Sequence, residues 1–248
     1  MAGHSKWANI KHRKAAVDKK RGKMWSKCSR AIIVAARAGG GDPSFNLALR
    51  YAIDEAKTAN MPKDTIEKAV KKGSGAAGGE HYEHIRYEGY GPGGVAILAD
   101  CLTDNVNRTA PEIRSLFDKY NGNLGKPGSV AFGFEQKGII VIEASRISED
   151  KLMEVALEAG AEDVGESDGA WEVTSSASDF LAVKEAIVAA GVEPDSAEIT
   201  MVPQTLVRCD ETLSAKVLRI IDALEDNDDV QKVYHNADIP EQVLAKLS

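Results

Sequence analysis

A run of lysines and arginines near the N-terminus is the part of the sequence whose residue types and spacing best suit binding chemistry. Asp18 is the only acidic residue between Lys6 and Arg30. A solvated helix face usually mixes acids with its cations, as Asp54, Glu55 and Lys57 do further along. Dense positive charge gains affinity for a polyanion by releasing counterions. The pattern therefore favours phosphate contact through Lys6, Lys11, Arg13, Lys14, Lys19, Lys20, Arg21, Lys23, Lys27 and Arg30.

Two aromatic side chains, Trp7 and His12, alternate with these cations. An exposed tryptophan stacks well on an unpaired base, so Trp7 and His12 join the predicted nucleic-acid contacts. The equal alternative for Trp7 is packing against the helices that follow.

A further candidate lies in the segment TDNVNRTAPE, residues 103–112. Thr109 and Glu112 have the spacing of a capping box, which explains both residues without any function. Arg108 precedes the predicted helix, where free backbone N–H groups attract anions. Arg108 is therefore predicted to hold a phosphate or a carboxylate, with simple capping of the helix as the alternative.

No pattern in the sequence predicts a cofactor, a metal or catalysis. Gly89, Gly91 and Gly94 match G-x-G-x-x-G, but a predicted strand follows where dinucleotide binding needs a helix, so a hairpin turn is favoured. His81 and His84 supply too few ligands for a zinc site. Without a nucleophile elbow, a Walker loop or an H-E-x-x-H motif, the chain is predicted not to be an enzyme.

Net charge divides the chain sharply. Residues 1–75 carry 17 Lys and Arg against 6 Asp and Glu, a net of +11, whereas the remainder carries −18. This asymmetry is typical of a protein that meets a polyanion with one segment only.

The rest of the composition is that of an ordinary cytoplasmic protein. Cys28, Cys101 and Cys209 are few and widely spaced, which favours reduced, buried thiols. No apolar run approaches the roughly 20 residues of a membrane span, and no secretory signal is evident at the N-terminus.

The basic third is predicted to be a small helical bundle. Apolar spacing predicts helices near 24–38, 42–56 and 62–73, the second capped by Asp42 with Phe45 on its buried side. The glycine-rich residues 73–80 form the best linker in the chain.

The remainder predicts two α/β domains. Strands at 82–89, 94–102 and 129–136 surround a helix near 110–120, whereas the order βαββαβ is complete within residues 137–205. The fold class is therefore α+β and multidomain, with a ferredoxin-like unit inserted into the other α/β domain. The predicted domains are 1–77, 78–136 plus 206–248, and the insertion 137–205.

The inserted domain carries 4 basic and 15 acidic side chains. Such a surface repels nucleic acid and is expected to face a basic protein surface, or simply to keep the chain soluble.

Five segments together resemble the YebC/PmpR family over essentially the whole chain: GHSKWANIKHRK, YEGYGPGG, LTDNVNRT, NGNLGKPGSVAF and DNDDVQKVYHN. The resemblance implies a three-domain cytoplasmic transcriptional regulator that binds DNA. Related mitochondrial proteins are translational activators, and bacterial members have been linked to stalled ribosomes. Two hypotheses therefore stand, a DNA-binding transcriptional regulator and a ribosome-associated factor that contacts rRNA or tRNA.

Overall fold

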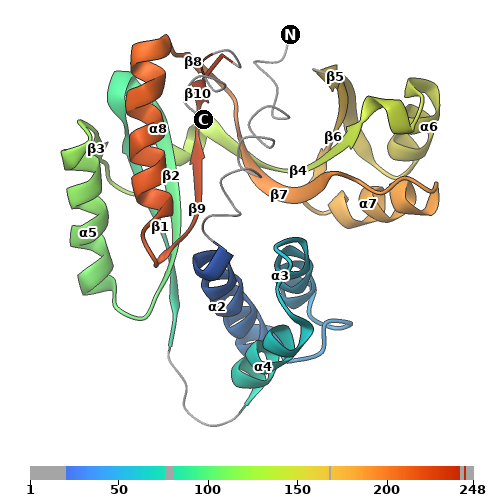
Figure 1. The fold of residues 1–248 in the computed structure, drawn as a ribbon, viewed down its shortest axis with the longest axis horizontal. Coiled ribbons are helices and arrows are strands. Elements are labelled where there is room, and N and C mark those ends of the chain that lie inside the picture. The colour runs from blue at the N-terminus through green and yellow to red at the C-terminus, as the bar shows by residue number, and fades with distance from the viewer. Residues whose placement is uncertain (1–20, 76–80, 168, 241–242, 244–248) are drawn as a thin grey trace. The chain divides into compact units, whose positions relative to one another are not determined.

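The computed structural model describes residues 21–75, 81–167, 169–240 and 243, and these divide into two compact units. The larger unit comprises the described residues up to Ser129 and residues 216–233. The smaller unit comprises residues 130–215 and the described residues from Tyr234 onward. Figure 1 gives the order of the elements.

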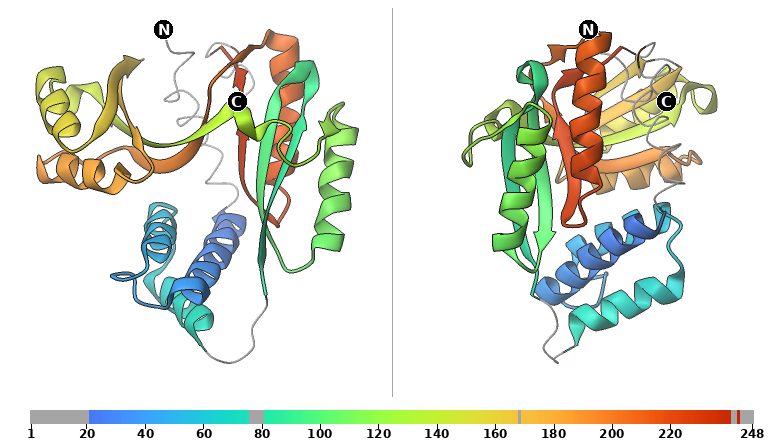
Figure 2. Two further views of the ribbon diagram at one scale, coloured as in Figure 1. Left: turned by 180° about the vertical axis from the view of Figure 1, so that it is seen from behind. Right: turned by 60° about the vertical axis from the view of Figure 1, so that its left-hand side comes forward.

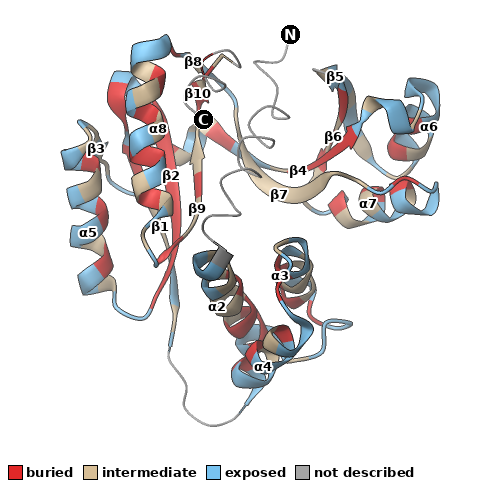
Figure 3. Cartoon of the chain, viewed as in Figure 1, coloured by how far each residue is buried: buried red, intermediate tan, exposed pale blue. Residues whose placement is uncertain are grey.

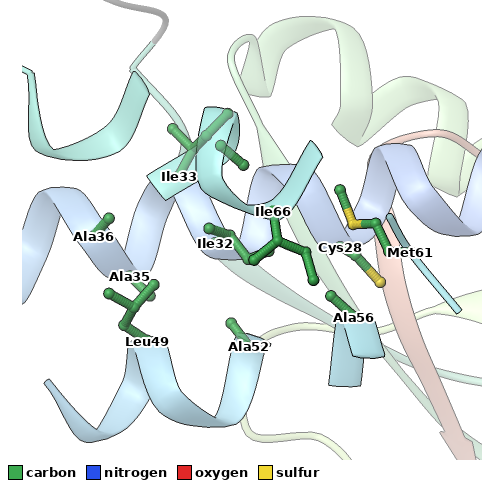
Figure 4. Close-up of a cluster of buried hydrophobic side chains, with 11 residues drawn as sticks. Cys28, Ile32, Ile33, Ala35, Ala36, Leu49, Ala52, Ala56, Met61 and Ile66 are labelled. Carbon is green, nitrogen blue, oxygen red and sulfur yellow. The ribbon is translucent and has the colours of Figure 1, made fainter. Parts of the chain in front are cut away.

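Three helices open the larger unit, and α2 packs on both of the others (Figure 2). The three helices share one buried core, to which α2 contributes Cys28 and Ile32 and α3 contributes Leu49 and Ala56 (Figure 4). The helices are α2 (Arg21–Gly39), α3 (Leu47–Thr58) and α4 (Lys63–Ser74).

One glycine allows α4 to lie close against α2. A Cβ on Gly73 would lie 2.5 Å from the carbonyl oxygen of Ile33 and 2.7 Å from the Cβ of Ala36. Because both contacts are too short for real atoms, only glycine fits at this crossing.

The start of α3 differs from the prediction. Asn46, not Asp42, caps the helix, because its side-chain oxygen accepts a hydrogen bond from the Leu49 N–H at 3.1 Å. Its amide nitrogen also donates to the carbonyls of Ala35 and Gly40, which fixes the connection to α2. Phe45 therefore falls in the loop before the helix, 89% exposed instead of buried.

A four-stranded sheet in the order β3-β1-β2-β9 completes the larger unit. β1 and β2 form an antiparallel hairpin in which Glu83 pairs with Thr103 and Tyr90 with Ala96. Gly93 and Gly94 adopt positive φ at the turn, as the hairpin interpretation of GYGPGG requires. β2 is buried along its whole length (Figure 3). The strands are β1 (Glu83–Tyr90), β2 (Ala96–Thr103), β3 (Asn123–Leu124) and β9 (Val230–His235).

Helix α5 (Val106–Lys119) packs on this sheet, and Phe117 lies so close over β1 that a Cβ on Gly89 would lie 2.7 Å from its ring. The cap of α5 is Asn105, whose side chain accepts from the Arg108 N–H, so the predicted capping box at Thr109 is wrong. Helix α8 (Glu211–Glu225) leads into β9. The part of α8 from Lys216 onward belongs to the larger unit.

The smaller unit contains the predicted βαββαβ order as an antiparallel sheet, β5-β6-β4-β7, with two helices. The predicted strand at 129–136 and the first strand of the predicted βαββαβ unit are not separate: a short 3-10 turn at Ala131–Gly133 leads into a single β4. The fold-class prediction is confirmed. The elements are β4 (Phe134–Glu143), α6 (Glu149–Glu158), β5 (Ala161–Ser167), β6 (Ala170–Ser176), α7 (Phe180–Ala189) and β7 (Ser196–Pro203).

The smaller unit also holds a short parallel pair, β8 (Val207–Arg208) with β10 (Ala237–Asp238). Within the described residues, no helix combines the length and the apolar composition that a membrane crossing needs. All three cysteines are free and buried, and burial raises the pKa of Cys28 to about 11 and that of Cys101 to about 12.

Candidate nucleic-acid interface

Helix α2 has two opposite faces. Cys28, Ile32 and Ala35 are buried on one of them. Lys23, Lys27 and Arg30 follow one another at i, i+4 and i+7, so they share the other face. We call these three residues the cationic face of α2.

The segment opposite this face is the turn between α8 and β9, residues Glu225 to Asp229, which we call the acidic turn. Lys27 Nζ donates to the carbonyl oxygen of Glu225 at 2.6 Å, and Lys23 Nζ donates to that of Asp226 at 2.9 Å. Arg30 donates to the carbonyl oxygen of Asp228. The last carbonyls of a helix lack intrahelical partners and carry partial negative charge, so cations stabilise this end of α8.

The carboxylates of the acidic turn add full charges to this contact. Lys23 Nζ lies 3.9 Å from Asp228 Oδ1, and the Asp228 side chain is 72% exposed. Burial lowers the pKa of Lys27, whereas the nearby charges of Glu225, Asp226 and Asp228 oppose that effect.

Asp229 is the buried end of the acidic turn. Its carboxylate accepts hydrogen bonds from Arg108 Nη2 and Thr109 Oγ1, both at 2.7 Å, and from Arg30 Nη1 and Thr103 Oγ1 at 3.2 Å. Burial by itself raises the pKa of this carboxyl group. The hydrogen bonds from Arg108 and Thr109 and the charges of both arginines outweigh burial, so the pKa of Asp229 lies below its ordinary value.

Arg108 connects this network to the surface. Besides Asp229, its guanidinium holds Asp104 at 3.0 Å, and its side chain is still 44% exposed. Arg30 also lies 5.8 Å from the ring centre of Tyr82, within the range of a cation–π contact.

These groups surround a strongly polar hollow of about 500 Å³ in the larger unit. Both cations and carboxylates line it, which suits a charged ligand better than an apolar one. Its lining residues are Lys23, Arg30, Tyr82, Asp104, Arg108, Glu112, Asp226, Asn227, Asp228 and Asp229. Over the described ranges, no group of three or more His, Cys, Asp or Glu is arranged to hold a metal ion.

The structure brings together four of the predicted contact residues: Lys23, Lys27, Arg30 and Arg108 all meet the acidic turn. Arg21 begins α2. The remaining predicted contacts lie outside the described residues, namely Lys6, Trp7, Lys11, His12, Arg13, Lys14, Lys19 and Lys20.

Sequence reasoning missed the acidic turn itself. The cluster Glu225, Asp226, Asp228 and Asp229 lacks the spacing of a calcium loop, and no local pattern marks it as a site. Opposite charge at the two ends of a chain is a signal for such a contact, but it does not specify which residues meet. Thr103 and Thr109 were missed for a different reason, since their hydroxyls serve a carboxylate about 120 residues away in sequence.

The fold and the site define a class: an α+β protein that pairs a basic helical segment with acidic α/β parts and presents a cationic helix face. Two family models match the chain, the TACO1/YebC N-terminal domain over residues 5–76 and the TACO1/YebC second and third domain over residues 82–237. The chain belongs to the TACO1/YebC family.

Individual relatives agree with this assignment. A protein of Methylococcus capsulatus is 56% identical over 248 residues, and one of Rubrobacter xylanophilus is 52% identical over 250 residues; both comparisons cover each chain completely. Each is named a probable transcriptional regulatory protein. The crystal structure of a conserved hypothetical protein from Aquifex aeolicus is similar with a TM-score of 0.83 and 48% identity, covering 95% of this chain and 98% of that one.

Proposed function

We propose that the protein is a non-enzymatic, cytoplasmic, DNA-binding transcriptional regulator that grips phosphate backbones with its basic N-terminal segment. The observation that carries the proposal is the density of cations from Lys6 to Arg30, which continues into the cationic face of α2. The names of the full-length relatives support a regulatory role. Lysines and arginines on phosphates fix the position of a protein on DNA but read little sequence.

The test uses salt to separate backbone contact from base reading. Each phosphate contact releases counterions, so the binding constant should fall with log salt at a slope of about −0.9 per contact on duplex DNA. Changing Lys19→Ala and Lys20→Ala together should flatten the slope by nearly two contacts and weaken binding to all sequences alike, as fluorescence anisotropy titrations would measure.

A matched control changes Lys216→Ala and Arg219→Ala, two exposed cations of α8. This variant should keep the slope of the parent protein. A slope that Lys19→Ala and Lys20→Ala leave unchanged, or an affinity loss on one sequence only, would contradict backbone gripping.

A second candidate is a ribosome-associated translation factor that contacts rRNA or tRNA. It is supported by the resemblance to mitochondrial translational activators and by the fact that phosphate contacts serve RNA as well as DNA. Sequencing the nucleic acid that is crosslinked to the protein in cells distinguishes the two, because promoter DNA and ribosomal RNA are exclusive results.

The domain limits 1–77, 78–136 plus 206–248, and 137–205 also stay a proposal. In this division the domain 137–205, with 15 acidic and 4 basic side chains, does not bind nucleic acid and instead faces a basic protein surface.

A further inference from the structure

The cationic face of α2 is occupied from within the chain, and the following inference, which rests on the proposed function, concerns how that contact regulates binding. Lys23, Lys27 and Arg30 each donate to a carbonyl oxygen of the acidic turn. A phosphate oxygen can accept hydrogen bonds from the same side chains, and it carries a full negative charge where a backbone carbonyl oxygen carries only a partial one. A lysine or arginine that holds the turn is therefore a group that a phosphate would also bind.

The contact has a fixed end and an exposed end. At the fixed end, the buried carboxylate of Asp229 is held by Arg108, Thr109 and Arg30. At the exposed end, Lys23 is 51% exposed and faces Asp228, which is 72% exposed. Exposed ion pairs contribute little free energy and exchange readily with other ions, so this end opens at small cost.

The side-chain charges of the acidic turn act on the same two lysines that hold its backbone. The charges of Asp226 and Asp228 both act on Lys27, and Asp228 lies 3.9 Å from Lys23. A phosphate that approached Lys23 would meet the carboxylate of Asp228 at close range, and one that approached Lys27 would meet the negative charge of both Asp226 and Asp228. Like charges repel, so phosphate and acidic turn exclude one another at this face.

We infer that the acidic turn is an internal competitor for the cationic face of α2: Asp226 and Asp228 stand where nucleic-acid phosphates bind, and binding displaces them while Asp229 keeps the turn attached. The intrinsic affinity of the basic segment is thereby lowered in the whole protein. A basic partner that binds the acidic turn would raise the affinity for nucleic acid.

The test neutralises the competitor without changing its shape. Asp226→Asn with Asp228→Asn keeps the backbone carbonyls, so the turn should fold as before. Affinity for a short labelled DNA duplex, and for a short single-stranded RNA, should rise about two- to tenfold, because two carboxylate charges no longer oppose binding. The salt slope should steepen by about one contact or more, because the freed lysines then release counterions on binding.

The control removes the same charge elsewhere. Glu166→Gln with Glu185→Gln changes two exposed acids of the smaller unit and leaves the acidic turn intact. It should change affinity less than about twofold, because neither acid belongs to the acidic turn and exposed charges are screened at physiological salt. Asp228→Asn alone, at the more exposed position, should give part of the effect and serves if the double variant folds poorly.

The outcomes separate this inference from the proposed function. If the parent protein binds and the double variant binds no more tightly, or no more tightly than the control, the acidic turn does not compete and the inference is wrong. If neither the parent nor the double variant binds DNA or RNA, the proposed function is wrong and the inference falls with it. Binding by the double variant alone would mean that the competition is nearly complete.

Discussion

Asp229 shows how much a single buried carboxylate can organise. Four donors from three elements converge on it, and Arg30 and Arg108 both contribute charge. The residue thereby joins α2, the end of β2 and the start of α5 to the acidic turn. A buried charge of this kind is stabilising only while its partners remain.

Changing Asp229→Asn should therefore destabilise the protein at neutral pH. The variant keeps the shape of the side chain but loses the charge-assisted hydrogen bonds, so the free energy of unfolding should fall by about 1–3 kcal/mol in urea titrations. Asp104→Asn removes a carboxylate that holds the same arginine at the surface, and its effect should stay within about 0.5 kcal/mol.

The same variant gives a test by pH. Folding lowers the pKa of Asp229. The charge of Asp229 therefore contributes fully to the free energy of unfolding above the unfolded-state pKa of about 3.9, and this contribution is lost as pH falls through the folded-state pKa. The loss in free energy of unfolding caused by Asp229→Asn should thus be greatest between about pH 5 and pH 7 and should shrink below about pH 4. A deficit that was unchanged in acid would show that the charge is not what stabilises the network.

At the scale of elements, the crossing of α2 and α4 depends on Gly73. Alanine is the better helix former by about 1 kcal/mol, so Gly73→Ala would stabilise an isolated α4. In the protein its Cβ meets the Ile33 carbonyl at 2.5 Å, and such overpacking costs about 1–3 kcal/mol. We expect the clash to outweigh propensity and the melting temperature to fall.

Gly22→Ala is the matched control, because Gly22 also belongs to a helix and a Cβ there would have no neighbour within 4 Å. That change should be neutral or slightly stabilising. Equal effects of both changes on the melting temperature would contradict a specific clash at Gly73.

Elements with clear periodicity were predictable from the sequence, and their ends were not. The apolar spacing of α2 and the region of α4 follow directly from the pattern of Cys28, Ile32 and Ile66. The predicted start of α3 was wrong because Asp42 and Asn46 are both good capping residues. Asn46 is favoured by hydrogen bonds from its amide nitrogen to the carbonyls of Ala35 and Gly40, which the sequence does not reveal. The cationic residues were predictable by charge, whereas their acidic neighbours were not, because no local pattern relates residues about 200 positions apart.

At the scale of the whole molecule, the division of charge predicts how fragments behave. Residues 1–75, with a net charge of +11, should keep most of the nucleic-acid affinity, whereas residues 80–248 should keep little. The buried cluster of the helical part draws only on residues from Cys28 to Ala69, which favours independent folding of the first fragment. Its helicity can be verified by circular dichroism before titration.

The internal competitor sharpens this expectation. The first fragment lacks the acidic turn, so it should bind at least as tightly as the whole protein at low salt. Weaker binding by a folded fragment, or equal binding by both fragments, would contradict the assignment of binding to the basic segment.

The separation of Lys27 and Glu225 by 198 residues also sets an order in time. At about 5–20 residues per second, translation makes the basic helix about 10–40 s before its acidic counterpart exists. During that interval the newborn chain carries its cations without the carboxylates that later face them, next to a ribosome made largely of RNA. We therefore expect the basic segment of each molecule to have its highest affinity for nucleic acid while the chain is still being synthesised. Completion of the C-terminal segment then lowers that affinity.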